Sequence, residues 1–129
     1  MTESRDGGVE RDPLAFIPLR PVEFEILLTL SGGDAHGYGI IKESQGRNPE
    51  KGPMGTGTLY RALRRLTESG LVEPVEERPA PDLDDERRRY FSITAFGRAV
   101  AAAEARRLSA QLDAARAREL LSGAGGSGS

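Results

Sequence analysis

Three arginines gather in one short stretch of the chain, residues 54–75, which reads MGTGTLYRALRRLTESGLVEPV. Arg61, Arg64 and Arg65 stand beside Tyr60, and the small residues Gly-Thr-Gly-Thr come shortly before them. Guanidinium groups bind phosphates and, when two donors are used together, the edge of guanine. The chemistry that this stretch offers is therefore recognition of anions, although the whole chain carries a net charge of -2.

The apolar residues of the same stretch predict the helix that positions the arginines. They recur at the i, i+3, i+4, i+7 spacing of one helix face: Leu59, Ala62, Leu63 and Leu66. A helix from about Gly57 to Ser69, with Thr56 as its N-cap, would turn this face to a protein core. Arg61 and Arg64 would then point directly away from that core.

The remaining sequence predicts the elements around this helix. We expect a helix over residues 21–31, a helix over 35–46 that Asp34 caps, strands over 71–78 and 87–94, and a last helix from Ala95 to about Leu121. This order predicts a mainly α fold with a small β-hairpin, a winged helix-turn-helix followed by a long C-terminal dimerisation helix. The expected parts are a disordered arm at 1–17, the winged helix-turn-helix at 18–94, the dimerisation helix at 95–121 and a disordered tail at 122–129.

The first and last helices each carry apolar residues on two sides, so each needs partners on two sides. A chain of 129 residues buries a modest fraction of its surface, and a second copy would cover the faces that remain. The sequence therefore predicts a homodimer. The residues expected in its interface are Val22, Phe24, Ile26, Leu27, Leu108, Leu112 and Ala115.

Several classes of function find no support in the composition. The chain has no cysteine and a single histidine, His36, so we expect neither a disulfide framework nor a metal site. No nucleophile–base pair and no phosphate-cradling glycine loop is found, so we expect neither an enzyme nor a cofactor. The N-terminus lacks the apolar segment of a signal peptide, and no stretch of about 18 apolar residues is present. We therefore expect a cytoplasmic protein with no membrane partner.

Four segments together carry a family resemblance: HGYGI, GTLYRALRRLTESGLVE, RRRYFSIT and AFGRA. From about Leu19 to Leu121, the chain resembles the PadR family of transcriptional regulators, in its shorter branch with a single C-terminal helix. The resemblance implies a homodimeric winged-helix repressor of a palindromic operator, with the first and last helices in the dimer interface. It also implies that a small-molecule effector, if one exists, binds at the seam between these helices.

The positive charge of the chain is concentrated around the arginine-rich helix, since residues 35–70 hold six basic and three acidic side chains. If that helix enters the major groove of double-stranded DNA, its first half meets base edges and phosphates. The residues expected to contact DNA are Tyr38, Thr56, Thr58, Tyr60, Arg61, Arg64, Arg65 and Arg88. Arg65 is expected to reach a phosphate at most. The arginines at 87–89 either reach the minor groove or the backbone of DNA from the wing, or neutralise the acidic turn before them.

Two other interpretations stay open at this stage. The arginine face could be solvated, with Arg61 and Arg64 both in reach of Glu68. The fold could also serve as a protein-interaction module without specific DNA binding, which the acidic overall balance would suit. A DNA affinity that falls steeply with salt separates a DNA-binding repressor from such a module.

Overall fold

Helices make up most of the architecture. The computed structural model describes residues 11–75 and 89–121. Its helices are η1 (Pro13–Phe16, a 3-10 turn), α1 (Pro21–Ser31), α2 (Gly37–Arg47), α3 (Thr56–Glu68) and α4 (Ala95–Ala117), and its strands are β1 (Ala35–His36), β2 (Val72–Pro74) and β3 (Tyr90–Ile93). This is the order of a winged helix-turn-helix with a long last helix, so the predicted fold class is confirmed.

Short-range capping explains where two of the helices begin. Pro21 occupies the first position of α1, where its missing N–H costs nothing, and the Glu23 carboxylate accepts a hydrogen bond from the backbone N–H of Arg20 at 3.2 Å. At α4, the Thr94 hydroxyl accepts a hydrogen bond from the N–H of Gly97 at 2.9 Å. These contacts satisfy amides near the helix starts that have no partner within their own helix, so the starts of α1 and α4 are well defined.

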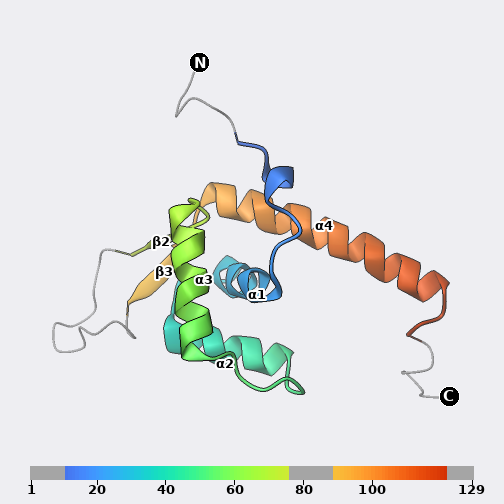
Figure 1. Ribbon diagram of the computed structural model, residues 1–129, viewed down its shortest axis with the longest axis horizontal. Helices are drawn as coiled ribbons and strands as arrows, with labels where there is room; N and C mark the ends of the chain where they lie inside the picture. Colours follow the sequence, from blue (N-terminus) through green and yellow to red (C-terminus); the bar gives the residue numbers. More distant parts are fainter. Residues whose placement is uncertain (1–10, 76–88, 122–129) are drawn as a thin grey trace.

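α1 lies at the centre of the fold, with α2, α3 and α4 packed around it (Figure 1). Its buried side chains Ile26, Leu27 and Leu30 belong to the same apolar cluster as the core face of α3. That core face consists of the predicted residues: Leu59, Ala62, Leu63 and Leu66. Full burial of a leucine or isoleucine contributes about 1.5–3 kcal/mol relative to exposure, so the contact between α1 and α3 is a main source of stability.

A small antiparallel sheet lies at one side of the helices, with its strands in the order β1-β3-β2 (Figure 1). β3 is central: Phe91 pairs with Ala35 of β1 and with Pro74 of β2, and Ile93 pairs with Val72. Phe91 and Ile93 are buried on the apolar face that their alternation predicts. β1 is not predicted from the sequence, because two residues carry no periodicity.

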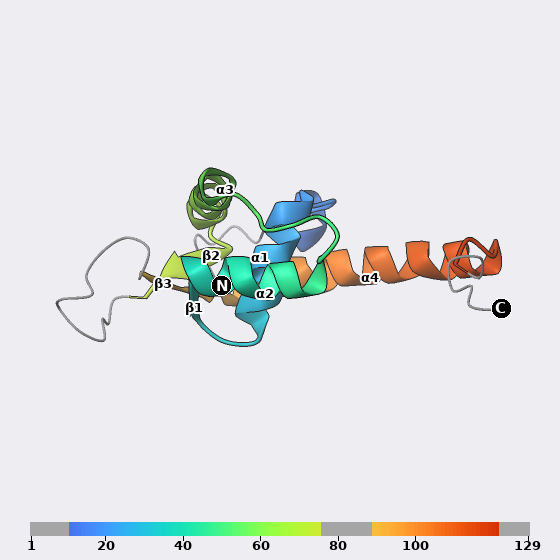
Figure 2. The same ribbon diagram turned by 90° about the horizontal axis from the view of Figure 1, so that it is seen from below.

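α4 divides into two halves with different surroundings. Its first half packs on the domain and buries Val100, Ala101, Ala103 and Glu104. After Glu104 no described residue of this helix is buried, and Figure 2 shows the second half running past the rest of the molecule. A helix of 23 residues is about 35 Å long, so α4 outreaches the domain that supports it.

A buried carboxylate ties α4 to the segment before α1. Glu104 is 2% exposed and accepts hydrogen bonds from the backbone N–H of Leu19 at 3.1 Å and from Arg107 at 2.7 and 2.9 Å. The hydrogen bonds from Arg107 hold the pKa of Glu104 below its usual range, although burial alone would raise it. This pair therefore sits, charged, where α4 leaves the domain.

Two predicted helix caps are wrong. Asp34 does not cap α2, because Ala35 and His36 pair with β3 and the helix begins only after them. The His36 Nδ1 accepts the hydrogen bond from the N–H of Gly39 instead, at 3.1 Å. At α3 the chain is still extended at residue 55, so Gly55 is the N-cap and the predicted cap residue is the first residue of the helix.

The chain ends also differ from the predictions where the structure describes them. The predicted disordered arm extends too far, because residues 13–16 form η1 and the Phe16 ring packs edge-on against Phe96 of α4 at 5.3 Å. α4 ends at Ala117, four residues earlier than expected. The first ten residues of the arm and the predicted tail at 122–129 lie outside the described residues.

Candidate nucleic-acid interface

α3 turns a polar face to solvent along its length. Opposite the core face it carries Gly57, Arg61, Arg64 and Glu68, all exposed. The Arg61 side chain folds back toward the first turn, since a Cβ placed on Gly57 would lie 3.3 Å from the Arg61 Nη1. A guanidinium group and the first-turn amides, which have no partner within the helix, therefore lie together at the N-terminal end of α3.

Arg61 and Arg64 have no counter-charge in the part of the chain that the structure describes. The ion pairs of that part involve other arginines, and neither side chain donates a hydrogen bond to a described residue. Glu68, the partner expected if the face were merely solvated, does not pair with them there. Two guanidinium groups that form no ion pair within residues 11–75 and 89–121 are able to bind an anion from outside the chain.

Arg65 differs from its two neighbours. Its Nε donates to the Glu23 carboxylate of α1 at 2.9 Å. The Glu23 side chain is 12% exposed, and its other oxygen accepts the N–H of Arg20. The charge of Arg65 is thus neutralised within the chain, where it fixes α3 against α1. The expected contact of Arg65 with a phosphate stays a prediction, and it would require this pairing to open.

The other predicted contacts surround the start of α3. Thr56 and Thr58 are exposed in its first turn, and Tyr38 is 51% exposed in the first turn of α2. Tyr60 is half-buried, because its hydroxyl lies against Gly37, where any side chain would collide with it. Tyr60 therefore packs α3 against α2. The predicted contact Arg88 lies outside the described residues.

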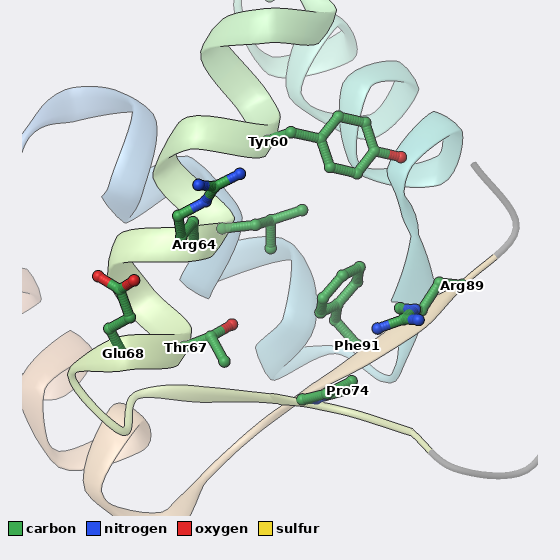
Figure 3. A pocket seen from close by; sticks show the side chains of 8 residues that line it. Tyr60, Arg64, Thr67, Glu68, Pro74, Arg89 and Phe91 are labelled. Carbon is green, nitrogen blue, oxygen red and sulfur yellow. The ribbon is translucent and has the colours of Figure 1, made fainter. Parts of the chain in front are cut away.

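A groove lies between α3 and the strands of the wing (Figure 3). Its volume is about 400 Å³, and its lining comes from both sides: Tyr60, Leu63, Arg64, Thr67, Glu68, Pro74, Arg89 and Phe91. Figure 3 shows Phe91 between Arg64 of α3 and Arg89, the residue before β3. The groove thus carries one guanidinium group on each side, and the Glu68 carboxylate also lines it on the α3 side.

The DNA contacts predicted from the sequence include Arg88 of the wing but not Arg89. The run of three arginines at 87–89 predicts a contact at the wing without saying which member makes it. The alternation of a strand would have resolved the choice, because side chains two residues apart point to the same side. Arg89 is two residues before Phe91, and both line the groove.

The predicted interface residues fall into two groups. Ile26 and Leu27 are 0% exposed in the core of a single chain, because three helices of that chain surround α1. They have no surface for a partner, so their assignment to the interface is corrected. The other five keep exposed surface: Val22, Phe24, Leu108 and Ala115 are half-buried, and Leu112 is 41% exposed. α1 also exposes Leu28, which the prediction left out.

Membrane-spanning helices and metal sites can be assessed over residues 11–75 and 89–121. No helix in these ranges has the length and apolar character needed to cross a membrane. No three acidic, histidine or cysteine side chains there lie together in a way that could hold a metal ion.

Comparison with known proteins gives matches over most of the described chain. The family model of the transcriptional regulator PadR-like family matches residues 26–103. An uncharacterized protein of transposon TN4556 from Streptomyces fradiae is 36% identical over 83 residues, which are 62% of this chain and 21% of that protein. The chain thus spans about a fifth of the length of this curated relative.

Two solved structures show the same fold. A transcriptional regulator from Clostridium thermocellum has a TM-score of 0.61 at 25% identity, over 74% of this chain and 89% of that one. PadR of Bacillus subtilis, solved in complex with operator DNA, has a TM-score of 0.54 at 19% identity, over 66% of this chain and 46% of that one.

Proposed function

This chain belongs to the PadR-like family of transcriptional regulators, and on that basis we propose that it is a repressor that binds a palindromic operator as a homodimer. The observation that carries the proposal is the exposed face of α3, with Arg61 and Arg64 opposite the leucines of the core. Such a helix reads the major groove in winged helix-turn-helix proteins. The Bacillus subtilis neighbour, solved with operator DNA, supports the same use of the fold here.

The two arginines have different places in this proposal. Arg61 lies over the first turn of α3, and the N-terminal residues of a recognition helix are the ones that contact base edges. Arg64 lies one turn later and lines the groove toward the wing. We assign Arg61 to base readout and Arg64 to the phosphate backbone of DNA. Contacts with that backbone fix the register of the protein on the duplex without reading the base sequence.

The groove between α3 and the wing would seat the backbone of one DNA strand. Arg64 and Arg89 can neutralise phosphates from its two sides, while the exposed Pro74 offers apolar surface to the sugars. Thr67 adds a hydroxyl on the same side as Arg64. This arrangement supports a contact made by α3 and the wing together.

The second half of α4 supports the proposed homodimer. This half projects past the domain and carries Leu112, 41% exposed, beside the half-buried Leu108 and Ala115. A contiguous apolar helix face with no cover of its own is typical of an interface. Two copies joined along α4 and the exposed Leu28 side of α1 would present two α3 helices to two half-sites of a palindrome.

A small-molecule effector, where the protein uses one, belongs in this proposal at the seam between α1 and α4. The exposed half of α4 is rich in alanine, and small side chains leave room between paired helices. A ligand that moved the paired helices would change the distance between the two α3 helices and so release the operator.

Selection of bound sequences from a random pool of double-stranded DNA tests the proposal. We expect the pool to converge on a palindrome, and the affinity for it to fall linearly with the logarithm of salt concentration. Enrichment of a single, non-repeated half-site would contradict the dimer. Failure of the pool to converge, with weak binding to all DNA, would favour the protein-interaction module instead.

A further inference from the structure

Arg11 makes three contacts at the far end of α3 from the proposed base contacts. Its Nη1 donates to the backbone carbonyl of Ser69, the C-cap of α3, at 2.6 Å. Its guanidinium lies over the Phe96 ring of α4, 4.2 Å from the ring centre, and 5.5 Å from the Phe16 ring of η1. Arg11 thus joins α3 to α4 and to the segment before α1. It lies outside residues 26–103, which the family model matches.

The electrostatics of these contacts favour one position for the end of α3. The last carbonyls of a helix lack partners within it and carry the negative end of the helix dipole, so a guanidinium there is stabilising. The ring face of Phe96 attracts the same cation. Phe96 in turn packs edge-on against Phe16, which holds the ring in place.

The turn that follows α3 leaves little freedom around Arg11. Gly70 has φ +81°, and a Cβ there would lie 2.8 Å from the Arg11 Nη2, so a side chain would displace the guanidinium. From the other side, the Thr94 hydroxyl donates to the carbonyl of Gly70 at 2.7 Å. The turn after α3 is therefore held between Arg11 and the first turn of α4.

We propose that Arg11 is a positioning residue of the recognition helix, fixing the C-terminal end of α3 on α4. This inference rests on the proposed function of α3. The core leucines and the Glu23–Arg65 ion pair fix α3 against α1, and Arg11 adds a contact to α4 beside the hydrogen bond from Thr94 to the turn. Without it, α3 samples orientations in which Arg61 misses its base, and the apparent operator affinity falls with the competent fraction.

Hydrogen exchange and operator binding by the full chain test this inference together. In Arg11→Ala we expect faster exchange of the backbone amides of Ser69, Gly70 and Leu71, and a loss of operator affinity of about three- to tenfold. The salt slope of binding should stay that of the parent, because no phosphate contact is removed. Arg98→Ala, which removes the same charge from an exposed position of α4, is the matched control.

Two further variants separate the contacts of Arg11. Phe96→Leu removes the ring beneath the guanidinium without changing the charge, and it should raise the exchange of the same three amides. Arg11→Lys keeps the charge but loses the planar fork, so its exchange and affinity should lie between those of the parent and Arg11→Ala.

Four outcomes would overturn the inference. Exchange near Ser69 as in the parent would show that Arg11 does not hold the turn, and faster exchange with unchanged operator affinity would leave it a stability role only. A smaller salt slope in Arg11→Ala would make Arg11 a direct phosphate contact. An equal loss of affinity in Arg98→Ala would assign the effect to net charge. None of these would bear on the proposed function, because that is tested by the binding of the parent chain to an operator.

Discussion

α3 and α4 both lie on the outside of the molecule, but the rest of the chain covers their apolar faces to different extents. α3 has one apolar face, and the domain covers it from Leu59 to Leu66. α4 is covered only as far as Glu104, and beyond it apolar side chains such as Leu112 remain in solvent. The exposed residues of α3 include Arg61 and Arg64, whereas those of the second half of α4 include Leu112 and several alanines beside polar side chains such as Asp113.

This difference indicates two kinds of partner. A helix whose apolar face is already covered offers hydrogen-bond donors and charge to the outside, which suits a polar polymer. A helix whose apolar face is uncovered needs another apolar face, and a second copy of the chain supplies one.

The largest effect is expected for the free arginines of α3 at the operator. In a dimer each substitution acts at two half-sites, so Arg61→Ala should cost about 2–6 kcal/mol of operator binding if a bidentate base contact is lost at each. Arg64→Ala should weaken operator and scrambled DNA alike and reduce the salt slope. Titration of both DNAs at several salt concentrations measures this. Operator binding as tight as that of the parent in both variants would mean that α3 is not the reader.

The second effect is on folding stability. Leu63 is buried against the core, so Leu63→Ala should lower the free energy of unfolding by about 2–5 kcal/mol through lost burial and a cavity. Leu112→Ala removes the same atoms from an exposed position of α4. At protein concentrations where the chain is monomeric, its effect on denaturant unfolding should stay within about 0.5 kcal/mol. Equal costs in the two variants would contradict the contrast between the helices.

The third effect is on association. Leu112→Glu places a charge on the apolar face of α4, once in each copy, and should raise the dimer dissociation constant about 100-fold, or about 3 kcal/mol. Leu108→Glu should act in the same direction. Arg106→Glu is the matched control, because Arg106 is exposed and, at 100° per residue, lies on the opposite side of α4 from Leu108 and Leu112. Sedimentation that shows equal dimers for all three variants would remove α4 from the interface.

The sequence predicts periodic features of this fold well and short or tertiary ones poorly. The leucine face of α3 follows from the spacing of four residues, and the long α4 follows from an unbroken run without glycine after Gly97. What the pattern could not show is which of two apolar faces finds a partner within the chain. Ile26 and Leu27 satisfy a helical pattern whether α2 and α4 of the same chain or a second copy covers them.

Charged residues show the same limit. Arg61, Arg64 and Arg65 are the same residue type. Their angles on the helix place the first two opposite the core face and the third at its flank. The partner of Arg65, however, is Glu23, 42 residues away in the chain, and no local spacing encodes that distance. The same holds for Arg11 and Ser69, which are 58 residues apart.

The fourth effect concerns pH, through the carboxylate where α4 leaves the domain. The pKa of Glu104 is lowered in the folded protein by its hydrogen bonds from Arg107, so its charge stabilises the fold above the pKa of the unfolded chain. That stability is lost as pH falls through the folded pKa. Glu104→Gln should therefore cost about 1–3 kcal/mol at pH 7 and progressively less below pH of about 4.5. Unfolding at a series of pH values measures this, and a cost that is constant with pH would contradict it.

The smallest effect is expected for the arginine of α3 that already has a partner. Arg65 and Glu23 are partly buried and 2.9 Å apart, so a double-mutant cycle of Arg65→Gln and Glu23→Gln should give a coupling of about 0.5–1 kcal/mol in unfolding free energy. Because Glu23 neutralises the charge of Arg65 within the chain, Arg65→Gln should leave the salt slope of operator binding unchanged. Arg64→Gln, one position earlier, is the matched control and should lower the slope. If both substitutions lower the slope equally, Arg65 reaches a phosphate in the complex, and the pairing with Glu23 gives way when DNA binds.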